Sequence, residues 1–386
     1  MSQLTVSQAA SLYIAHKVLP PECEALRGEV REFLARTLPF HRDAVPQTFS
    51  AFDPAFSRKL GEQGWIGMPW PKQYGGHERS ALERYVVCEE LLAANAPVLA
   101  HWIADRQIGA QLLRFGTETL REKMLPAIAR GELYFSLGMS EPDSGSDLAS
   151  IRTRAEKVEG GWSVNGRKIW NTAHHAHYML ALVRTAKSTE DRHAGMSQLI
   201  IDLKAPGVSV RRIRNLTGVE GFSEVLFEDV FVADDHLLGE EGRGWKQVTT
   251  ELGDERAGPE RYMSSYQLLT CMIDAAPADN DRTAVAIGRL IAEARTLRNM
   301  SVGLAGMSAR GEEINTAGAL FKDLGTTFEQ QVPDVASDLF ELEQLDQTAP
   351  LAVSLRRITQ MAPSYSLRGG SREVLRGMIA RKLGLR

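Results

Sequence analysis

The chain has few cysteines, and their placement excludes a disulfide scaffold. Only 3 cysteines occur among 386 residues, far apart and without a Cys-x-x-Cys pair. We therefore expect buried reduced thiols and a cytoplasmic protein. Long apolar runs are also missing, since the longest are about the length of Tyr178–Val183, well below the roughly 20 residues that span a bilayer. Residues 1–20 lack the basic start of a signal peptide, so we expect no membrane association.

No excess of either charge is present. The chain has 45 basic and 49 acidic side chains, a formal net charge of −4. A footprint for nucleic acid along the whole sequence would need a basic excess, so we expect no nucleic-acid partner. The apolar share of 43% and the charged share of 24% are those of an ordinary globular protein, which excludes disorder and collagen-like repeats.

Familiar nucleotide-binding and catalytic motifs are absent as well. No G-x-G-x-x-G follows a strand, which argues against a Rossmann nicotinamide site, and no G-x-S-x-G nucleophile elbow occurs. The run Gly161–Lys168 imitates a P-loop but lacks Gly-Lys-Ser/Thr. His174, His175 and His177 imitate a metal cluster, but adjacent side chains point apart, so we expect a polar loop and no metal.

The spacing of apolar residues changes twice along the chain. From about residue 22 to 130 it is helical, with further helices expected over 82–92 and 108–125. The Gly-, Pro- and aromatic-rich run 64–76 predicts a structured loop. The stripe of the first helix consists of Leu26, Val30, Phe33, Leu34 and Leu38.

From about residue 131 to 239 the period drops to two, as in strands. Asn165-Gly166, between Trp162–Val164 and Lys168–Trp170, predicts a hairpin turn. Strands follow strands without a helix between them, so we expect a mainly antiparallel sheet. Further strands are expected over 178–185, 196–203, 208–212 and 224–232.

A helical period returns after residue 244. One face of a long helix is predicted to contain Ile287, Leu290, Ile291, Ala294, Leu297, Ser301 and Leu304. The chain is therefore predicted to be α+β: helical, then β, then helical. We expect an N-terminal extension over residues 1–21, an N-terminal helical domain over 22–130, a middle antiparallel β-barrel or sandwich domain over 131–239, and a C-terminal helical domain over 240–386.

Two short segments carry the chemistry. Leu137–Asp147 has small and hydroxylated residues around a Glu-Pro turn, which suits close backbone approach to a phosphorylated ligand. In the segment Lys168–Thr172, Trp170 and Thr172 are two residues apart in sequence. Side chains two apart share a face of an extended segment, so this pair is predicted to address one planar ligand. Taken alone, Trp170 is more typical of a core aromatic.

These segments resemble the acyl-CoA dehydrogenase family of flavoproteins. The resemblance continues through Pro69–Gly76, through Phe227–Ala233 with Gly239 and Gly242, and into Gly369–Arg376, and it covers essentially the whole chain after residue 22. It implies a C-terminal four-helix bundle. The runs Thr249–Arg256 and Gly311–Asn315 are most similar to the branch that shortens steroid side chains in actinobacteria.

The resemblance implies FAD-dependent α,β-dehydrogenation of an acyl-CoA thioester to the 2-enoyl-CoA, with electrons passed to an electron-transfer flavoprotein. Members remove two hydrogens from the α and β carbons, which requires a base, a polarised carbonyl and a hydride acceptor. Ser146 is implied near the pyrophosphate and the acyl-CoA. The implied cofactor residues are Leu137, Met139, Ser140, Ser146, Trp170, Asn171, Thr172, Ser371 and Glu373.

The expected catalytic base departs from the commonest family pattern. Many members place it in a Tyr-Glu-Gly-Thr motif, where this chain has Arg368–Ser371 with Gly369 in the position of the glutamate. A minority, including isovaleryl-CoA dehydrogenases, takes the base from an earlier helix in a pattern ending Glu-Arg. The run Gly253-Asp254-Glu255-Arg256 then implies Glu255 as base and Asp254 and Arg256 as substrate contacts. The alternative for Glu255 is a residue on the helix surface that pairs with a nearby Arg.

Two further expectations follow from the resemblance. The backbone N–H of Gly369 is expected to help polarise the thioester carbonyl. Homotetrameric members carry Arg-x-x-Phe-Gly for the FAD phosphates of a neighbouring subunit, and residues 266–284 lack it. The chain then resembles the base-carrying half of a heterotetramer with a homologous subunit, unless Arg282 or Arg289 substitutes in a homotetramer.

Two other roles stay open on this scaffold. One is a flavin monooxygenase or nitroalkane oxidase, which need not keep Glu255. The other is a non-catalytic subunit that completes the site of another chain. Reduction of bound flavin by an acyl-CoA separates the first role from a dehydrogenase, and flavin recovery with and without a homologous chain addresses the second.

Overall fold

The computed structural model describes residues 12–38, 51–186 and 191–385, and the side chains of residues 251–255 also lie outside the described set. The larger part of the predicted extension, residues 1–11, is therefore not covered. The chain groups into two compact units. The helical unit comprises Met1–Thr48, Ser80–Ala96 and Gly253–Arg386, and the sheet unit comprises Phe49–Arg79 and Pro97–Leu252. These two units do not test the division into four consecutive parts predicted above, which stays a prediction.

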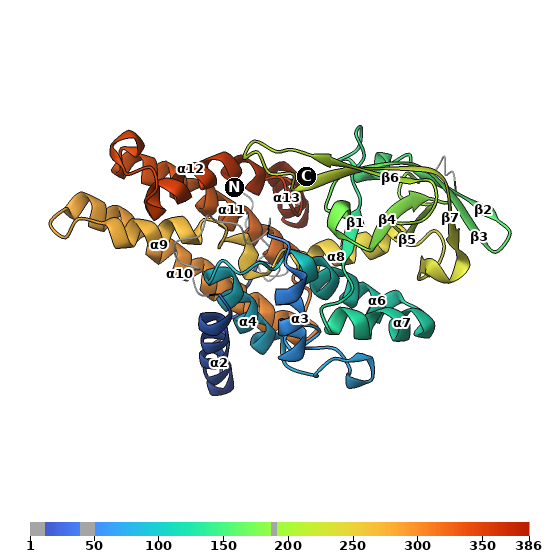
Figure 1. The fold of residues 1–386 in the computed structure, drawn as a ribbon, viewed down its shortest axis with the longest axis horizontal. Coiled ribbons are helices and arrows are strands. Elements are labelled where there is room, and N and C mark those ends of the chain that lie inside the picture. Colours follow the sequence, from blue (N-terminus) through green and yellow to red (C-terminus); the bar gives the residue numbers. More distant parts are fainter. Residues whose placement is uncertain (1–11, 39–50, 187–190, 386) are drawn as a thin grey trace. The chain divides into compact units, whose positions relative to one another are not determined.

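The sheet unit is built around one 8-stranded sheet in the part of the chain that is described (Figure 1). Its order is β6-β7-β3-β2-β4-β5-β8, with β1 paired to β4. Every neighbouring pair is antiparallel except β1–β4 and the single β2–β4 contact, which confirms the mainly antiparallel prediction. The strands are β1 Phe135–Gly138, β2 Arg154–Val158, β3 Gly161–Asn171, β4 Tyr178–Arg184, β5 Met196–Asp202, β6 Val208–Ile213, β7 Phe222–Ala233 and β8 Leu237–Leu238.

Strands β4 and β5 are buried on both faces. Met179 and Ala181 lie in one apolar cluster, whereas Leu182 and Met196 lie in another with Val248 of helix α8, Gly244–Glu255. Covering both faces removes the alternation of apolar and polar residues, because neither face is left to water. This explains the unbroken apolar run Tyr178–Val183 in the sequence.

The hairpin predicted at Asn165-Gly166 is wrong. Strand β3 runs straight through this pair and shifts register against β7 there. Gly166 has φ 148°, and a Cβ would lie 2.5 Å from Thr153 Oγ1, while Asn165 Nδ2 donates to Asp229 Oδ1 at 2.8 Å. The Asn-Gly pair thus serves a β-bulge. The turn lies earlier, between β2 and β3, where Gly160 has φ 72°.

The helices of the sheet unit show a second correction. The helix predicted over 108–125 is interrupted at Gly116, whose backbone is extended, and Thr117 then caps α7 by accepting from the Leu120 N–H at 3.3 Å. The run 64–76 is a structured loop, as predicted, and it buries Trp70. The remaining helices are α3 Pro54–Glu62, α5 Leu99–Ile103, the π-helical turn η2 Ala104–Ile108, α6 Gly109–Phe115 and α7 Glu118–Ala129.

The helical unit packs two segments from the first hundred residues with the C-terminal helices (Figure 1). Helix α11 packs against α10, α12 and α13, and α9 packs against α12. The expected α+β class, with helices before and after the strands, is confirmed. The helices are α2 Pro21–Thr37, α4 Ala81–Ala93, α9 Tyr266–Ala275, α10 Asp281–Ala309, α11 Asn315–Leu339, α12 Pro350–Tyr365 and α13 Arg372–Lys382.

The predicted stripes of α2 and α10 are mostly buried. In α2 the stripe from Leu26 to Leu34 is buried, and in α10 Leu290, Leu297 and Leu304 are buried. Ile291 is the exception, because it is 45% exposed. One residue along a helix turns the side chain by about 100°, so Ile291 lies beside the face that Leu290 occupies.

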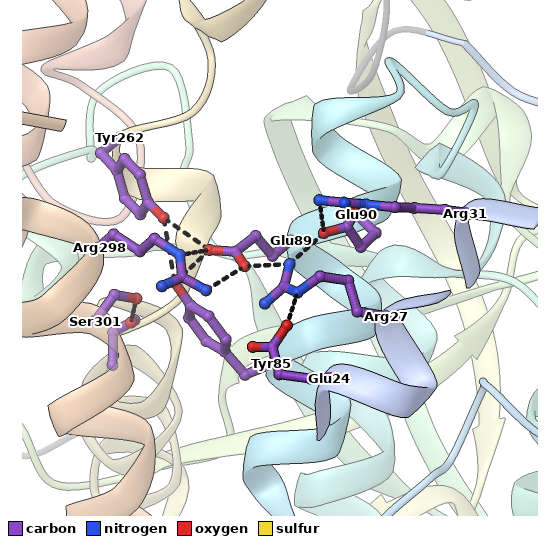
Figure 2. A network of polar contacts seen from close by, with 10 residues as sticks. Glu24, Arg27, Arg31, Tyr85, Glu89, Glu90, Tyr262, Arg298 and Ser301 are labelled. Atoms are coloured by element: carbon purple, nitrogen blue, oxygen red, sulfur yellow. Dashed lines mark hydrogen bonds and ion pairs between the residues drawn. The ribbon is translucent and has the colours of Figure 1, made fainter. Parts of the chain in front are cut away.

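A buried polar network links helices of this unit that are far apart in sequence (Figure 2). At its centre Glu89 of α4 accepts two hydrogen bonds from Arg298 of α10, at 2.6 and 2.9 Å, and one from Arg27 of α2 at 2.9 Å. The hydroxyls of Tyr85 and Tyr262 lie 3.1 Å apart and both donate to Glu89. Burial raises the pKa of both tyrosines, so they remain protonated donors at neutral pH.

Candidate active site

The segment after β1 contains the first predicted cofactor residues. Leu137, Met139 and Ser140 are half-buried. Gly138 lies so close to β4 that a Cβ would be 2.4 Å from Met179 Sδ, which explains the glycine at this position. The Ile169 N–H donates to the Ser140 carbonyl at 3.0 Å, so the segment is attached to β3.

An ion pair that sequence reasoning missed lies against this segment. Lys168 Nζ donates to Glu141 Oε1 at 2.9 Å and to the Met139 carbonyl at 3.0 Å, and both charged residues are buried. Glu141 also accepts from the N–H groups of Arg152 and Thr153 at 2.7 and 2.9 Å. Both residues stand inside the motifs quoted above. No local signal singled out Lys168, because β3 also contains the polar residues Ser163, Asn165 and Arg167.

The pKa values of the pair follow from their surroundings. Burial lowers the pKa of Lys168 to about 8, against the opposing charge of Glu141. Burial alone would raise the pKa of Glu141, but the charge and hydrogen bond of Lys168 and the two backbone donors hold it below its ordinary value. The pair is therefore ionised at neutral pH.

Trp170 lies in a strained and exposed position. Its φ is 61°, a left-handed conformation that costs about 1–3 kcal/mol in a non-glycine residue. It is 59% exposed. Its ring meets the ring of Phe222 edge to face, with the two ring centroids 6.0 Å apart. The backbone bulges between Ile169 and Asn171, so the regular extended alternation expected for Trp170 and Thr172 is absent. Such strain is concentrated at ligand sites.

Asn171 and Thr172 follow the bulge. Asn171 is buried, and its Oδ1 accepts from the Ala173 N–H at 3.1 Å. Its Nδ2 has no hydrogen-bond partner among the residues that the structure covers. The Thr172 N–H donates to Ser136 Oγ at 3.1 Å. An unpaired buried donor next to an exposed aromatic fits the acceptor-rich edge and flat face of a flavin.

Ser146 lies in the exposed part of the loop before β2. Within the described residues its hydroxyl forms no hydrogen bond, and a Cβ on its neighbour Gly145 would meet nothing within 4 Å. The adjacent Asp147 forms an ion pair with Arg192. An exposed hydroxyl beside an open glycine fits a phosphate group, as the resemblance implied.

The histidines after β3 are held by neutral contacts. The His174 ring meets Ser223 Oγ, His175 stacks on Phe52 at 4.3 Å, and His177 Nδ1 accepts from the Tyr134 N–H at 3.1 Å. Burial lowers the pKa of each of the three. Over the described ranges no group of His, Cys, Asp or Glu could hold a metal ion.

In the helical unit, the turn before α13 contains Gly369 and Gly370, with φ of 66° and 96°. Arg256 Nε donates to the Gly369 carbonyl at 3.2 Å, and Lys322 Nζ donates to the Gly370 carbonyl at 2.6 Å. A Cβ at Gly369 would lie 3.2 Å from the guanidinium of Arg261. The N–H of Gly369 donates to no described residue. The turn thus has restrained carbonyls and a free donor.

The remaining predicted residues of this unit are placed as follows. Glu255 and Asp254 belong to α8, but their side chains lie outside the described residues. Arg256 is buried and also contacts Met378 Sδ at 3.7 Å. Ser371 caps α13 by accepting from the Val374 N–H at 3.4 Å. Glu373 is exposed, and hydrogen bonds from its own N–H and from Ser371 lower its pKa.

Among the described helices, none is long and apolar enough to cross a bilayer.

Residues 20–132 match the model of the acyl-CoA dehydrogenase N-terminal domain, and residues 136–230 match that of the middle domain. The chain is 32% identical over 382 residues to acyl-CoA dehydrogenase FadE29 of Mycobacterium tuberculosis, covering 94% of this chain and 96% of that protein.

Two solved structures of similar length show the same fold. The Tcur3481-Tcur3483 steroid ACAD aligns with TM-score 0.86 and 28% identity over 95% of this chain and 97% of that chain. The ChsE4-ChsE5 complex of Mycobacterium tuberculosis aligns with TM-score 0.83 and 28% identity over 96% and 100%. From its domains and its relatives, the chain belongs to the acyl-CoA dehydrogenase family of FAD-dependent oxidoreductases.

Proposed function

We propose that this chain catalyses α,β-dehydrogenation of an acyl-CoA thioester to the 2-enoyl-CoA. The observation that carries the proposal is the Gly369 turn, whose N–H is free while buried cations hold its two carbonyls. A fixed N–H without a partner is a suitable donor to a carbonyl oxygen that gains negative charge. FAD, when bound, accepts the hydride that leaves the β carbon.

In this proposal Glu255 removes the proton from the α carbon. Gly369 stands where many members carry their glutamate, and it has no side chain that could take a proton. A carboxylate enclosed with an acyl chain loses hydration, which raises its pKa and makes it a stronger base. Leu137, Met139, Ser140, Trp170, Asn171 and Thr172 bind the flavin, with Ser146 at a phosphate, Ser371 and Glu373 as further cofactor contacts, and Asp254 and Arg256 near the substrate.

The decisive experiment is anaerobic mixing of the flavin-loaded protein with a panel of acyl-CoA thioesters. We expect bleaching of the oxidised flavin band with stoichiometric 2-enoyl-CoA. No bleaching with any thioester, combined with NAD(P)H oxidation or nitroalkane consumption in air, would instead indicate the monooxygenase or oxidase role. Re-oxidation by an electron-transfer flavoprotein, measured in the same cell, tests the proposed electron acceptor.

We also propose that the chain is the base-carrying half of a heterotetramer with a homologous subunit. Helix α9 and the turn after it contain no Arg-x-x-Phe-Gly, so the FAD phosphates need cations from elsewhere. The names of two similar structures describe complexes of two chains, which supports the proposal. One FAD per chain in protein purified alone would exclude it. Low flavin content that a co-expressed homologue restores is the expected result.

We propose a cytoplasmic location because of the state of the three cysteines. Cys23, Cys88 and Cys271 are buried thiols outside any disulfide, as expected in a reducing compartment. Fractionation of the native cells, followed by detection of the chain in the soluble cytosolic fraction, tests it.

A further inference from the structure

We propose that Lys168 is a positioning residue that, together with Glu141, orients the Ser140 N–H for the flavin. The inference rests on the proposed cofactor role of Met139 and Ser140. Lys168 and Glu141 lie outside the set of residues assigned to cofactor or substrate above. Their hydrogen bonds connect three pieces of chain: the segment after β1, the two residues before β2 and the second half of β3.

The argument begins with the peptide group between Met139 and Ser140. A trans peptide is planar, and its C=O and N–H point in opposite directions. Lys168 Nζ holds the Met139 carbonyl at 3.0 Å, so the direction of the Ser140 N–H is fixed as well. Within the described residues that N–H donates to nothing.

The next peptide group is restrained independently. The Ser140 carbonyl accepts from the Ile169 N–H at 3.0 Å, and the Glu141 N–H donates to the Ser144 carbonyl at 2.8 Å. The free Ser140 N–H therefore stands between two held carbonyls. A donor held in this way keeps its direction before the ligand arrives, which is what a preorganised site requires.

The position of Lys168 in β3 connects this donor to Trp170. Lys168 and Ile169 both bond the segment after β1, and the strained Trp170 follows directly. The side chain of Lys168 is fully buried, and a buried cation is retained where it has a partner. Loss of Lys168 would leave the segment after β1 attached to β3 by the Ile169 N–H alone, while Glu141 would still accept from the N–H groups of Arg152 and Thr153.

A purely structural role for the pair is the alternative, and a double-mutant cycle separates the two. The variants are Lys168→Met, Glu141→Gln and the double variant, in the full-length chain with any homologous subunit that flavin loading requires. Lys168→Met leaves Glu141 buried without its cation, so its melting temperature should fall. The double variant removes both charges and should regain most of that loss.

FAD affinity distinguishes the roles. If Lys168 orients the Ser140 N–H, the double variant should bind FAD at least about tenfold more weakly than wild type, with an altered visible absorption band of the bound flavin. Recovery of wild-type FAD affinity along with the melting temperature would overturn the inference. The matched control is Arg167→Met with Glu224→Gln, which removes a more exposed ion pair of 3.2 Å between Arg167 of β3 and Glu224 of β7 and should leave FAD affinity unchanged.

A measurement on wild-type protein keeps the test decisive if the variants do not fold. Hydrogen exchange of the peptide that contains Ser140 should be fast without FAD and protected with it. Protein that loads FAD without protecting this peptide overturns the inference but leaves the proposed function standing. Wild-type protein that takes up no FAD under any condition refutes the proposed function and this inference together.

Discussion

The two units hold their candidate functional groups in different ways. In the sheet unit a lysine and a carboxylate pair locally, 27 residues apart in sequence, and fix one short segment. In the helical unit Glu89 receives arginines 62 and 209 residues away and joins whole helices. The same chemistry thus orients a donor in one unit and assembles the fold in the other. Variants in the two units should therefore fail differently.

A second difference concerns the chemistry that each unit offers. The sheet unit presents free donors and an exposed aromatic, which suit a cofactor: the Ser140 N–H, Asn171 Nδ2 and Trp170. The helical unit offers the free Gly369 N–H and the proposed base Glu255, which suit a thioester. Changes at Gly369 or Glu255 should reduce turnover with FAD retained, whereas changes at Ser140, Asn171 or Trp170 should reduce FAD affinity.

The largest effect is expected for Glu255→Gln. Gln keeps the shape of the side chain and removes the base, so anaerobic flavin reduction should slow by about 100- to 10,000-fold while FAD stays bound. Stopped-flow absorbance and the flavin-to-protein ratio measure the two quantities. Glu241→Gln, at an exposed position before α8, is the control. A Glu255→Gln protein that reduces flavin at nearly the wild-type rate would assign the base elsewhere.

Glu89→Gln should separate fold from function. It leaves the buried Arg27 and the half-buried Arg298 without their shared carboxylate, which is expected to lower the free energy of unfolding by about 3 kcal/mol, measured by urea denaturation. FAD content and flavin reduction per folded chain should stay unchanged. Glu32→Gln removes an exposed pair with Arg36 and should cost less than about 1 kcal/mol. Equal losses in the two variants would contradict the network's role.

The dependence of the unfolding free energy on acid pH gives a second measurement of the role of Glu89. Burial would raise its pKa, but the hydrogen bonds and charges of Arg298 and Arg27 hold it below the ordinary value of 4.5. A lowered pKa means that its stabilisation is complete above pH 4.5 and is lost as the pH falls through the folded-state value. The advantage of wild type over Glu89→Gln should therefore be constant near neutral pH and disappear in acid.

Lys322→Met tests the turn at Gly369. Without the donor to the Gly370 carbonyl the turn is less restrained, so the Gly369 N–H should polarise the thioester less well. We expect about a tenfold loss in the rate of flavin reduction, below the effect of deleting a donor outright, with FAD retained. Lys382→Met, an exposed residue near Glu313, is the control. A thioester-analogue complex whose carbonyl lies beyond hydrogen-bond distance of this N–H would refute the role.

The sequence predicted the fold well in helices and strands whose buried residues recur with a single regular spacing. The stripe of α2 is buried along one helix face, β4 is buried along nearly its whole length, and β7 alternates between buried and less buried residues over its first half. The failures occur where local preference and tertiary contact compete. Asn165-Gly166 favours a tight turn, but Asn165 bonds Asp229 across the sheet and Gly166 fits against Thr153. Gly116 ends a helix within an otherwise helical pattern.

The candidate site was found from motifs rather than from periodicity. Trp170 and the segment from Leu137 to Ser140 carried the resemblance. The residues that hold them could not be singled out, because the partnership of Lys168 with Glu141 depends on the pairing of β3 with the segment after β1. A sequence contains both charges but not their distance. The same applies to Glu89, whose arginines lie on other helices.

The smallest stability effect is expected for Trp170→Gly. Glycine adopts the left-handed backbone freely, so relief of strain should offset the entropy cost of glycine and the lost Phe222 contact. We expect the unfolding free energy of the apoprotein to change by less than about 1 kcal/mol, while FAD affinity falls by about tenfold through the lost ring contact. The control, Trp162→Gly, removes an aromatic 3% exposed on the same strand and should cost about 3–5 kcal/mol. Equal destabilisation by both, with FAD affinity unchanged in Trp170→Gly, would make Trp170 a structural residue.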